Sequence, residues 1–368
     1  MKIIINGYVG PKITGIGRTL IETIKEISRQ SPDIEMVVYT NYDNSELINN
    51  MFRDNVKIKT YHISRKKSIK NLLFNSLIFP FLSLKERADI VYIPNFTLII
   101  FKFKPTIVVI HDMIEFKIKD KFSKIKMFYR HIAVPRMAKL SEHIIAVSEN
   151  SKNDIIDICK VDESKISVIY NGVANDFQLK KKEPPKLNYD YLLYVGTVDY
   201  PGKNLYNSIL AFEIYIKESN SDVKFVICGI PGKGFEKVNG LINNSNYRDH
   251  IKYLGYVKDK DLFNYYEYAK GFVFISYYEG FGLPVIEAMK FGIPVITSNR
   301  SSLPEIAGDA AIICDPDNID EICSAYKKIL EDSNIRTKLI NKGYSNLKRF
   351  SWEKTASQTI EILEKWAD

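Results

Sequence analysis

The chain has 368 residues, of which 45% are hydrophobic and 26% are charged, and its formal net charge is +8. Such a composition is typical of a soluble globular protein, and the length predicts two hydrophobic cores rather than one. The four cysteines are widely spaced and form no CxxC pair, which argues against a disulfide-stapled secreted scaffold and favours a reducing, cytoplasmic environment.

The start of the chain and its longest apolar stretch predict no membrane-spanning segment. Only three consecutive isoleucines stand near the N-terminus, which is too short a run for a signal peptide. The apolar stretch 72–84 is interrupted by Asn75, Ser76 and Pro80 and is too short to span a bilayer. We therefore expect a cytoplasmic protein without a transmembrane helix.

Short apolar runs alternate with helical patterns in the first half of the chain. A helix is expected over residues 18–30, and strands are expected over residues 2–6, 35–40, 90–93, 106–110, 143–147 and 165–170. Apolar strands without strict alternation are typical of a parallel sheet that is buried on both faces.

A polar segment then interrupts this alternation. Residues 178–186 contain three consecutive lysines and two prolines, which indicates a linker. Beyond it, strands are expected over residues 191–195, 224–228, 251–254, 272–275, 294–297 and 311–314, and helices over 205–218, 259–269, 283–291 and 319–331. We predict one α/β domain over residues 1–173, a linker over 174–189, a second α/β domain over 190–350 and a final helix over 351–368.

Positive charge is concentrated in the first half, since residues 1–180 carry +9 and residues 181–368 carry −1. Two stretches, 65–84 and 117–139, combine lysines and arginines with apolar and aromatic residues. Either they form solvated helix faces, or they contact an anionic membrane surface or a lipid-phosphate acceptor. No nucleic-acid motif accompanies the charge, so we expect no nucleic-acid partner.

The strongest local pattern follows the strand expected over residues 272–275. Gly280 and Gly282 permit a close approach of the backbone to a ligand, and Pro284 suits the first turn of a helix. The start of a helix presents free N–H groups to a phosphate. Glu279 precedes this helix and Glu287 lies within it, so we expect both carboxylates to accept hydrogen bonds from hydroxyl groups on either side of a diphosphate. A plain strand–turn–helix with one capping glutamate is the less favoured alternative.

Two further segments are weaker candidates for phosphate binding. The glycine-rich segment 7–18 lacks the G-K-[ST] of a P-loop, and no acidic residue ends the second strand as a nicotinamide dinucleotide site requires. It is either a phosphate loop or a flexible turn. Lys203 directly precedes a helix and is either a mobile charge for a phosphate or an exposed turn lysine.

His111 and Asp112 directly follow the strand expected over residues 106–110. His111 either hydrogen-bonds the hydroxyl groups of a ligand or is structural, which is the commoner role of a lone histidine. The other histidines show no ligand spacing, and no Asp-x-Asp follows a strand, so we expect no metal.

These segments, in this order, resemble the retaining glycosyltransferases of family four, and the resemblance covers essentially the whole chain. Glu279 and Glu287 match that family's signature of two glutamates with seven residues between them. Further segments that resemble the family are 15–17, 109–112, 146–151, 170–173, 196–197 with 203–204, 254–256 and 297–305.

The resemblance implies the GT-B fold, which is an α/β fold with two facing Rossmann-like domains, parallel sheets and an interdomain cleft. The final helix of this family commonly crosses back to the first domain. The resemblance also implies a nucleotide-diphosphate sugar as donor, no metal or other cofactor, and retention of the anomeric configuration. Its mechanism is front-face substitution, in which the leaving phosphate helps to deprotonate the acceptor.

The resemblance assigns a role to each candidate residue. Glu287 would hold the ribose hydroxyls, and Glu279 would hold the sugar together with the backbone around it. Lys203 and the loop 15–17 would meet the diphosphate, and His111 would lie near the sugar on the acceptor side. The catalytic residues are then His111, Glu279 and Lys203, and the donor-binding residues are Gly15, Gly17, Gly196, Thr197, Lys203, Asn204, Gly280, Phe281, Gly282, Leu283 and Glu287.

One position departs from the family pattern. Many relatives have an arginine before the lysine, where this chain has Gly202. Arg300 and Arg18 are candidates for the second diphosphate cation.

Within the family, segments 111–113 and 298–305 resemble mannosyl- and rhamnosyltransferases of surface-polysaccharide and O-antigen assembly. This implies GDP-mannose or another hexose or deoxyhexose donor, and a glycan or lipid-linked saccharide acceptor at the inner face of the cytoplasmic membrane. An inactive nucleotide-sugar-binding or scaffold protein is the alternative, against which the joint presence of Lys203, Glu279, Glu287 and His111 argues. The absence of the acidic residue disfavours a nicotinamide oxidoreductase.

Overall fold

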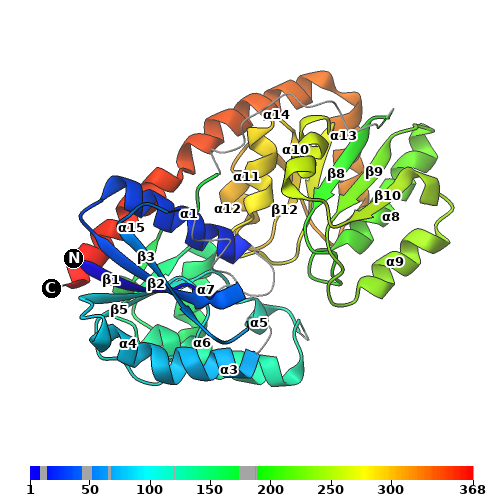
Figure 1. The fold of residues 1–368 in the computed structure, drawn as a ribbon. Coiled ribbons are helices and arrows are strands. Elements are labelled where there is room, and N and C mark those ends of the chain that lie inside the picture. The colour runs from blue at the N-terminus through cyan, green and yellow to red at the C-terminus, as the bar shows by residue number, and fades with distance from the viewer. Residues whose placement is uncertain are drawn as a thin grey trace. The chain divides into compact units, whose positions relative to one another are not determined.

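The computed structural model describes residues 1–8, 15–43, 52–64, 68–119, 121–173, 187 and 189–367. These residues form two compact units (Figure 1). Unit 1 comprises Met1–Gly172 with Phe350–Asp368, and unit 2 comprises Val173–Arg349. The predicted linker lies almost wholly outside the described residues, as do residues 65–67 of the first basic stretch and residue 120 of the second.

The described part of unit 1 contains a seven-stranded parallel sheet with the strand order β3-β2-β1-β4-β5-β6-β7. Its strands are β1 (Lys2–Asn6), β2 (Glu35–Asn41), β3 (Val56–Tyr61), β4 (Ile90–Ile93), β5 (Thr106–Ile110), β6 (His143–Ala146) and β7 (Ile166–Val168). Nearly every residue of β1, β4, β5 and β6 is buried, as expected for a sheet covered on both faces.

The helices of unit 1 cover both faces of this sheet. They are α1 (Gly15–Gln30), α3 (Ser68–Leu73), the π-helix η1 (Phe74–Ile78), α4 (Phe79–Lys85), α5 (Ile114–Lys117), α6 (Lys124–Leu140), α7 (Glu149–Cys159), the short helix η2 (Glu163–Lys165) and α15 (Trp352–Ala367). Because parallel connections are right-handed, α1, which leads from β1 to β2, lies on one face, and the helices of the later connections lie on the other. α15 packs beside α1 (Figure 1).

The described part of unit 2 contains a six-stranded parallel sheet with the order β10-β9-β8-β11-β12-β13. Its strands are β8 (Tyr191–Val195), β9 (Lys224–Cys228), β10 (Ile251–Gly255), β11 (Gly271–Phe274), β12 (Val295–Ser298) and β13 (Ala311–Cys314). Its helices are α8 (Leu205–Ser219), α9 (Phe235–Asn244), η3 (Arg248–His250), α10 (Asp259–Glu267), α11 (Leu283–Lys290), α12 (Leu303–Ala307), α13 (Ile319–Glu331), α14 (Ser333–Asn346) and η4 (Leu347–Arg349).

The fold confirms the predicted parallel α/β architecture, with one departure. Strand β3 was not predicted, although Lys57 and Lys59 alternate with other residues in a pattern that favours a strand at this edge of the sheet. The apolar stretch 72–84 is helical in spite of its polar residues. Asn75 is buried there and accepts a hydrogen bond from Asn6 Nδ2 at 3.1 Å, and Pro80 occupies the first turn of α4, where proline fits. Among the described residues, no helix is both long enough and apolar enough to cross a membrane.

Candidate functional site

In unit 2 the strand order reverses between two neighbouring strands in the middle of the sheet. Strands β8 and β11 are neighbours, but β8 is followed by β9 on one side and β11 by β12 on the other. Ligands of open α/β sheets bind at the carboxyl ends of the strands at such a switch point. Segment 196–197 with 203–204 and segment 279–287, which were singled out in the second half of the sequence, follow these two strands.

The loops after β8 and β11 bring Lys203 and Glu279 together. Lys203 Nζ lies 2.5 Å from Glu279 Oε1, and the two side chains are only 17% and 14% exposed. The ammonium group also lies 5.5 Å from the centroid of the Phe274 ring. The backbone N–H of Lys203 donates to Asp199 Oδ1 at 3.0 Å, which orients the loop. Two residues that were considered separately in the sequence therefore form one partly buried ion pair.

Tyr194 supports the loop that contains Gly196 and Thr197. Tyr194, on β8, donates its hydroxyl hydrogen to Thr197 O at 2.9 Å and so supports this loop from beneath. Burial raises the pKa of Tyr194 well above its ordinary value, and the charges of Asp199 and Glu279 raise it further. The tyrosine is therefore a permanent neutral donor.

Helix α11 begins directly at this edge of the sheet. Gly282 precedes it with φ of +105°, and a β-carbon there would lie 2.9 Å from Leu303 Cδ2. Only glycine adopts this turn without strain. One turn into the helix, Glu287 is 8% exposed and its Oε2 accepts a hydrogen bond from the hydroxyl of Tyr266 at 3.3 Å. The turn thus places helix N–H groups and two carboxylates within one short segment.

The loop after β12 holds Glu279 in position through its backbone. The N–H of Glu279 donates to Ser301 Oγ at 2.9 Å. The hydroxyl of Ser302 lies 3.0 Å from Glu279 O and 2.9 Å from Phe281 O, and donates to this pair of carbonyls. Segment 297–305, which was noted in the sequence only as a motif, therefore orients the glutamate.

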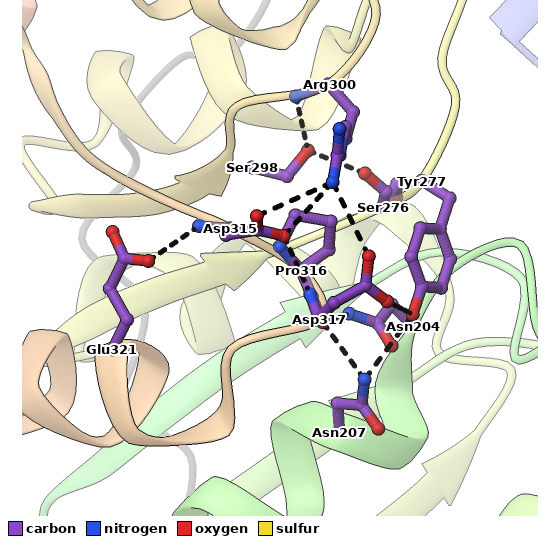
Figure 2. A network of polar contacts seen from close by, with 10 residues as sticks. All are labelled: Asn204, Asn207, Ser276, Tyr277, Ser298, Arg300, Asp315, Pro316, Asp317 and Glu321. Atoms are coloured by element: carbon purple, nitrogen blue, oxygen red, sulfur yellow. Dashed lines mark hydrogen bonds and ion pairs between the residues drawn. The ribbon is translucent and has the colours of Figure 1, made fainter.

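Arg300 lies at the centre of a second polar network at the same edge of the sheet (Figure 2). Its Nη2 contacts Asp315 Oδ1 at 3.2 Å and Asp317 Oδ2 at 3.5 Å. Asp317 Oδ1 accepts the hydroxyl hydrogen of Tyr277 at 2.7 Å, and the N–H of Tyr277 donates to Gly202 O at 2.9 Å. A chain of contacts therefore links Arg300 to Gly202, the position where many relatives have arginine.

Asn204 and Asn207 complete this network from the start of α8. Both side-chain amides donate to Pro316 O, at 2.7 and 3.0 Å. They connect the start of α8 to the loop after β13, so the loops after β8, β11, β12 and β13 are held together by polar contacts (Figure 2).

In unit 1, His111 directly follows β5 and has a defined tautomer. Its Nε2 lies 2.9 Å from Pro94 O, and because a carbonyl only accepts, Nε2 carries the proton and Nδ1 is an acceptor in the neutral ring. Burial lowers the pKa of His111, while the Pro94 carbonyl and Asp112 act in the opposite direction. The imidazole is therefore neutral at pH 7.

The segment 146–151 supports the backbone of His111. Ser148 caps α7 by accepting the N–H of Ser151 at 3.0 Å. The hydroxyl of Ser151 then donates to His111 O at 3.1 Å.

The glycine-rich segment of the first half is described only in part, because residues 9–14 lie outside the described residues. Gly15 and Gly17 begin α1, and Gly17 is buried. Gly15 O accepts a hydrogen bond from the hydroxyl of Thr19 at 3.0 Å, and Arg18 lies in the same first turn.

Comparison with known proteins identifies the family. Residues 13–177 match the family model described as Glycosyltransferase Family 4, and residues 175–346 match the model described as Glycosyl transferases group 1. The O-antigen chain mannosyltransferase B of Escherichia coli is 30% identical over 291 residues, which cover 77% of this chain and 76% of that protein. The chain belongs to the family 4 glycosyltransferases. A second relative of this glycosyltransferase, the O-antigen chain mannosyltransferase RfbU of Salmonella typhimurium, is 30% identical over 60% of each chain.

A solved structure shows the same fold as this glycosyltransferase. HepE of Anabaena, in complex with UDP and glucose, has a TM-score of 0.74 at 18% identity, and the match covers 99% of both chains. The expected GT-B fold, with two Rossmann-like domains built on parallel sheets, is thereby confirmed.

Sequence reasoning did not single out several residues that shape the site of this glycosyltransferase. Ser301 lies inside segment 297–305, and Asp199 and Tyr277 lie within two residues of segments 196–197 and 279–287, so their proximity in sequence was an available signal. Tyr266 and Asp317 lie outside every motif, and only the tertiary structure places them against Glu287 and Arg300.

Proposed function

We propose that this glycosyltransferase transfers a hexose or deoxyhexose from a nucleotide-diphosphate sugar to a glycan or lipid-linked saccharide of a bacterial surface polysaccharide. The observation that carries the proposal is the Lys203–Glu279 ion pair at the switch point of unit 2, beside the starts of α8 and α11. The names of the two relatives favour mannose as the transferred sugar, so GDP-mannose is the first donor to test. The ligands of HepE make UDP-sugars the second set to test.

The proposed donor contacts follow from the charges of unit 2. The diphosphate would accept hydrogen bonds from Lys203 and from N–H groups at the start of α11, where the helix dipole is positive. Glu279 would then exchange its contact with Lys203 for hydroxyl groups of the sugar. Glu287, oriented by Tyr266, would accept hydrogen bonds from the ribose hydroxyls.

The proposed reaction retains the anomeric configuration. The bond between the anomeric carbon and the leaving phosphate oxygen breaks, and a bond to the acceptor hydroxyl forms on the same face of the sugar. The acceptor proton passes to the leaving diphosphate. Stabilisation of the growing negative charge on the diphosphate is the main demand, and Lys203 meets it. Neutral His111 would accept a hydrogen bond from a sugar hydroxyl at Nδ1. The reaction as proposed requires no metal.

A donor screen tests this proposal. GDP-mannose, dTDP-rhamnose and UDP-glucose are incubated with the wild-type protein, with Lys203→Ala and with Glu279→Ala, and donor hydrolysis and thermal stabilisation are measured. We expect one donor class to be hydrolysed slowly by the wild type, a loss of at least about 100-fold in both variants, and retained configuration in the NMR spectrum of the transfer product.

Two results would contradict the proposal. Wild-type turnover in both variants would remove Lys203 and Glu279 from the site. Stabilisation by a donor without any turnover, by the wild type and with acceptor glycans present, would favour the inactive nucleotide-sugar-binding protein.

We also propose that unit 1 contacts an anionic membrane. Helices α3 to α4 and α6 lie on the same face of its sheet (Figure 1). Residues 68–85 and 121–140 contain no acidic residue. Ile125 is 85% exposed, Ile69 74% and Phe128 70%, and further exposed apolar side chains on these helices are Leu73, Leu77, Ile78, Phe81, Leu84 and Ile132.

The segment after β4 joins these two groups of helices into one surface. Arg136, on α6, donates to Ile99 O and Ile100 O at 2.9 and 3.0 Å. Phe81, on α4, packs against Phe103 with ring centroids 5.0 Å apart. Apolar side chains surrounded by lysines, without acidic residues, are typical of a surface that inserts into an anionic interface.

Vesicle sedimentation tests the membrane proposal. The wild-type protein should bind vesicles that contain phosphatidylglycerol at low salt, bind pure phosphatidylcholine weakly, and dissociate as the salt concentration rises. Ile125→Ser with Phe128→Ser should weaken binding about tenfold. Tyr256→Ser is the matched control, because Tyr256 is 68% exposed but belongs to unit 2. Equal binding by the double variant and the wild type would refute the proposal.

A further inference from the structure

Unit 1 has its own switch point, between β1 and β4, and three residues after β4 organise it. β1 is followed by β2 on one side of the sheet, and β4 by β5 on the other. In the segment after β4, the side-chain amide of Asn95 donates to Asn6 O at 2.8 Å and to Tyr8 O at 2.9 Å, which ties the end of β1 to the end of β4. His111 donates to Pro94 O in the same segment. Open α/β sheets generally bind ligands at such a switch point.

Arg130, on α6, is held over this segment. Its guanidinium carbon lies 4.2 Å from the centroid of the Phe96 ring and 4.9 Å from that of Phe122. The side chain is 15% exposed. Because contacts with two aromatic rings restrict the guanidinium, its N–H groups keep fixed directions before any ligand arrives.

A single buried carboxylate pairs with this guanidinium. Arg130 Nη1 lies 3.0 Å from Glu115 Oε2, and the Glu115 side chain is 1% exposed. Burial raises the pKa of Glu115, while Arg130 lowers it. The other carboxylate oxygen of Glu115, Oε1, is buried without a hydrogen-bond partner among the described residues. The ion pair of the Glu115 carboxylate in this part of the chain is therefore the one with Arg130. Glu115 is therefore a positioning residue for Arg130.

Most donors of Arg130 are left without a hydrogen-bond partner in the part of the chain that the structure describes. Among the described residues, Nη1 is the one guanidinium nitrogen with a hydrogen bond, although a guanidinium has five N–H donors. Partly buried arginines normally satisfy more donors than this. The other N–H groups of the guanidinium are thus available to an acceptor from outside the chain.

A second cation lies next to Arg130. Lys126, four residues earlier on α6, places its Nζ 4.0 Å from the centroid of the same Phe122 ring. Like charges at this spacing on a helix destabilise it, and α6 contains no acidic residue to offset them. The charge of Asp112, which follows His111, raises the pKa of Glu115. The carboxylate of Asp112 itself accepts a hydrogen bond from the backbone N–H of Ile114. Two cations around one ring, with one direct carboxylate partner, favour an anionic ligand.

We propose that Arg130, together with Lys126, binds a phosphate or diphosphate group of the acceptor substrate. The proposal rests on the proposed transferase function and names the acceptor class: a saccharide linked to a phosphate ester, with the phosphate on Arg130 and the saccharide toward His111. A bidentate guanidinium–phosphate contact matches the geometry of the fork that Phe96 and Phe122 hold in place. The phosphate belongs either to a lipid diphosphate or to a phosphorylated sugar.

Direct binding measurements on the full chain test this site independently of turnover. Farnesyl diphosphate, glucose 6-phosphate, GDP and UDP are titrated into the wild type, Arg130→Gln, Arg136→Gln and Lys203→Ala. We expect Arg130→Gln to weaken binding of farnesyl diphosphate about 10- to 100-fold and to leave GDP and UDP unchanged. Arg136→Gln is the control, because it removes the same charge from the same helix but Arg136 contacts the carbonyls of residues 99 and 100. The affinity of this variant for farnesyl diphosphate should stay within about twofold of that of the wild type.

The Lys203→Ala variant separates this inference from the donor site. It should lose affinity for GDP or UDP and keep that for farnesyl diphosphate. If Lys203→Ala keeps its affinity for GDP and UDP, the donor prediction is wrong, but the prediction for Arg130 is unaffected. Stronger Arg130-dependent binding of farnesyl diphosphate than of glucose 6-phosphate supports a lipid-linked acceptor, and the reverse order supports a phosphorylated sugar.

Two further variants separate binding from folding. Arg130→Gln leaves Glu115 buried without its cation, so the double variant Arg130→Gln with Glu115→Gln, which removes both charges, should recover thermal stability but not affinity. Arg130→Lys, which keeps the charge but loses the fork, should bind with intermediate affinity. Equal affinity of the wild type and Arg130→Gln for both phosphate probes, or recovery of affinity in the double variant, would overturn the proposal.

Discussion

Lys203 and Glu279 carry opposite charges 2.5 Å apart at low exposure, so each depends on the other before a donor binds. Replacing one partner leaves the other charge partly desolvated, which costs more than the ion pair itself contributes. Substitution of either residue should therefore lower both the free energy of unfolding and the activity, and the two effects can be measured separately.

A double-mutant cycle makes this concrete. We expect Lys203→Met and Glu279→Gln each to lower stability by about 1–3 kcal/mol and the double variant to be less destabilised than the sum, while all three lose transfer activity. Urea unfolding and donor turnover are the measurements. The pair of Lys342 and Asp309 is the control: its side chains are 35% and 79% exposed, so its removal should cost less than about 1 kcal/mol and leave activity intact. Additive destabilisation at Lys203 and Glu279 would contradict the coupling.

Arg300 is one of the two candidates for the cation missing at Gly202, and its two carboxylate partners make it testable. If Arg300 reaches the diphosphate, Arg300→Gln should raise the donor KM about tenfold. Asp317→Asn releases one of its partners and should leave the donor KM unchanged or lower it. A purely structural network predicts that both variants raise the donor KM together, so steady-state kinetics of the two distinguish the roles.

At the scale of elements, the start of α11 depends on the backbone of one residue. Gly282→Ala forces a β-carbon into a left-handed turn, 2.9 Å from Leu303 Cδ2. We expect a loss of about 1–2 kcal/mol in the free energy of unfolding, and a larger loss of donor affinity than of stability, because the helix N–H groups shift with the turn. Thermal unfolding and donor titration measure both quantities.

Gly240→Ala, in the interior of α9, is the matched control for this glycine. A β-carbon there would meet nothing within 4 Å. The substitution should stabilise the protein by about 0.5–1 kcal/mol through helix propensity and leave donor affinity unchanged. Equal effects of Gly240→Ala and Gly282→Ala would show that the turn has no special conformation.

At the scale of the whole molecule, the end of the chain stabilises its beginning. Helix α15 packs on α1, the hydroxyl of Thr355 donates to Tyr170 O at 2.6 Å, and the amide of Gln30 donates to Glu353 O at 2.9 Å. Trp352 and Leu363 are buried in unit 1. The last helix is therefore a structural part of unit 1.

Removal of residues 350–368 should consequently destabilise one unit selectively. Hydrogen exchange in the strands of unit 1 should accelerate, because α1 loses its partner and apolar side chains become exposed. Exchange in β8, β11 and β12 should stay as in the full chain. Uniform acceleration in both units would contradict the division.

Local sequence patterns were sufficient for much of the fold and for part of the site. The buried runs 2–6, 106–110 and 191–195 have the predicted strand bounds, since continuous apolar residues have few other stable environments. The glycine, proline and glutamate pattern of residues 279–287 predicted a strand–turn–helix, because these residue types act on their own backbone.

Strand order and contacts between distant residues were decided only by the tertiary structure. Neither the neighbouring positions of β8 and β11 nor the pairing of Lys203 with Glu279, 76 residues away, follows from periodicity. Arg130 appeared in the sequence as one charge of a basic stretch. Its partner Glu115 lies 15 residues earlier in the same connection, and Phe96 comes from the preceding connection of the sheet. The physical reason is that periodicity reports which face of an element is buried, whereas the partners of a side chain depend on which strands become neighbours when both cores close.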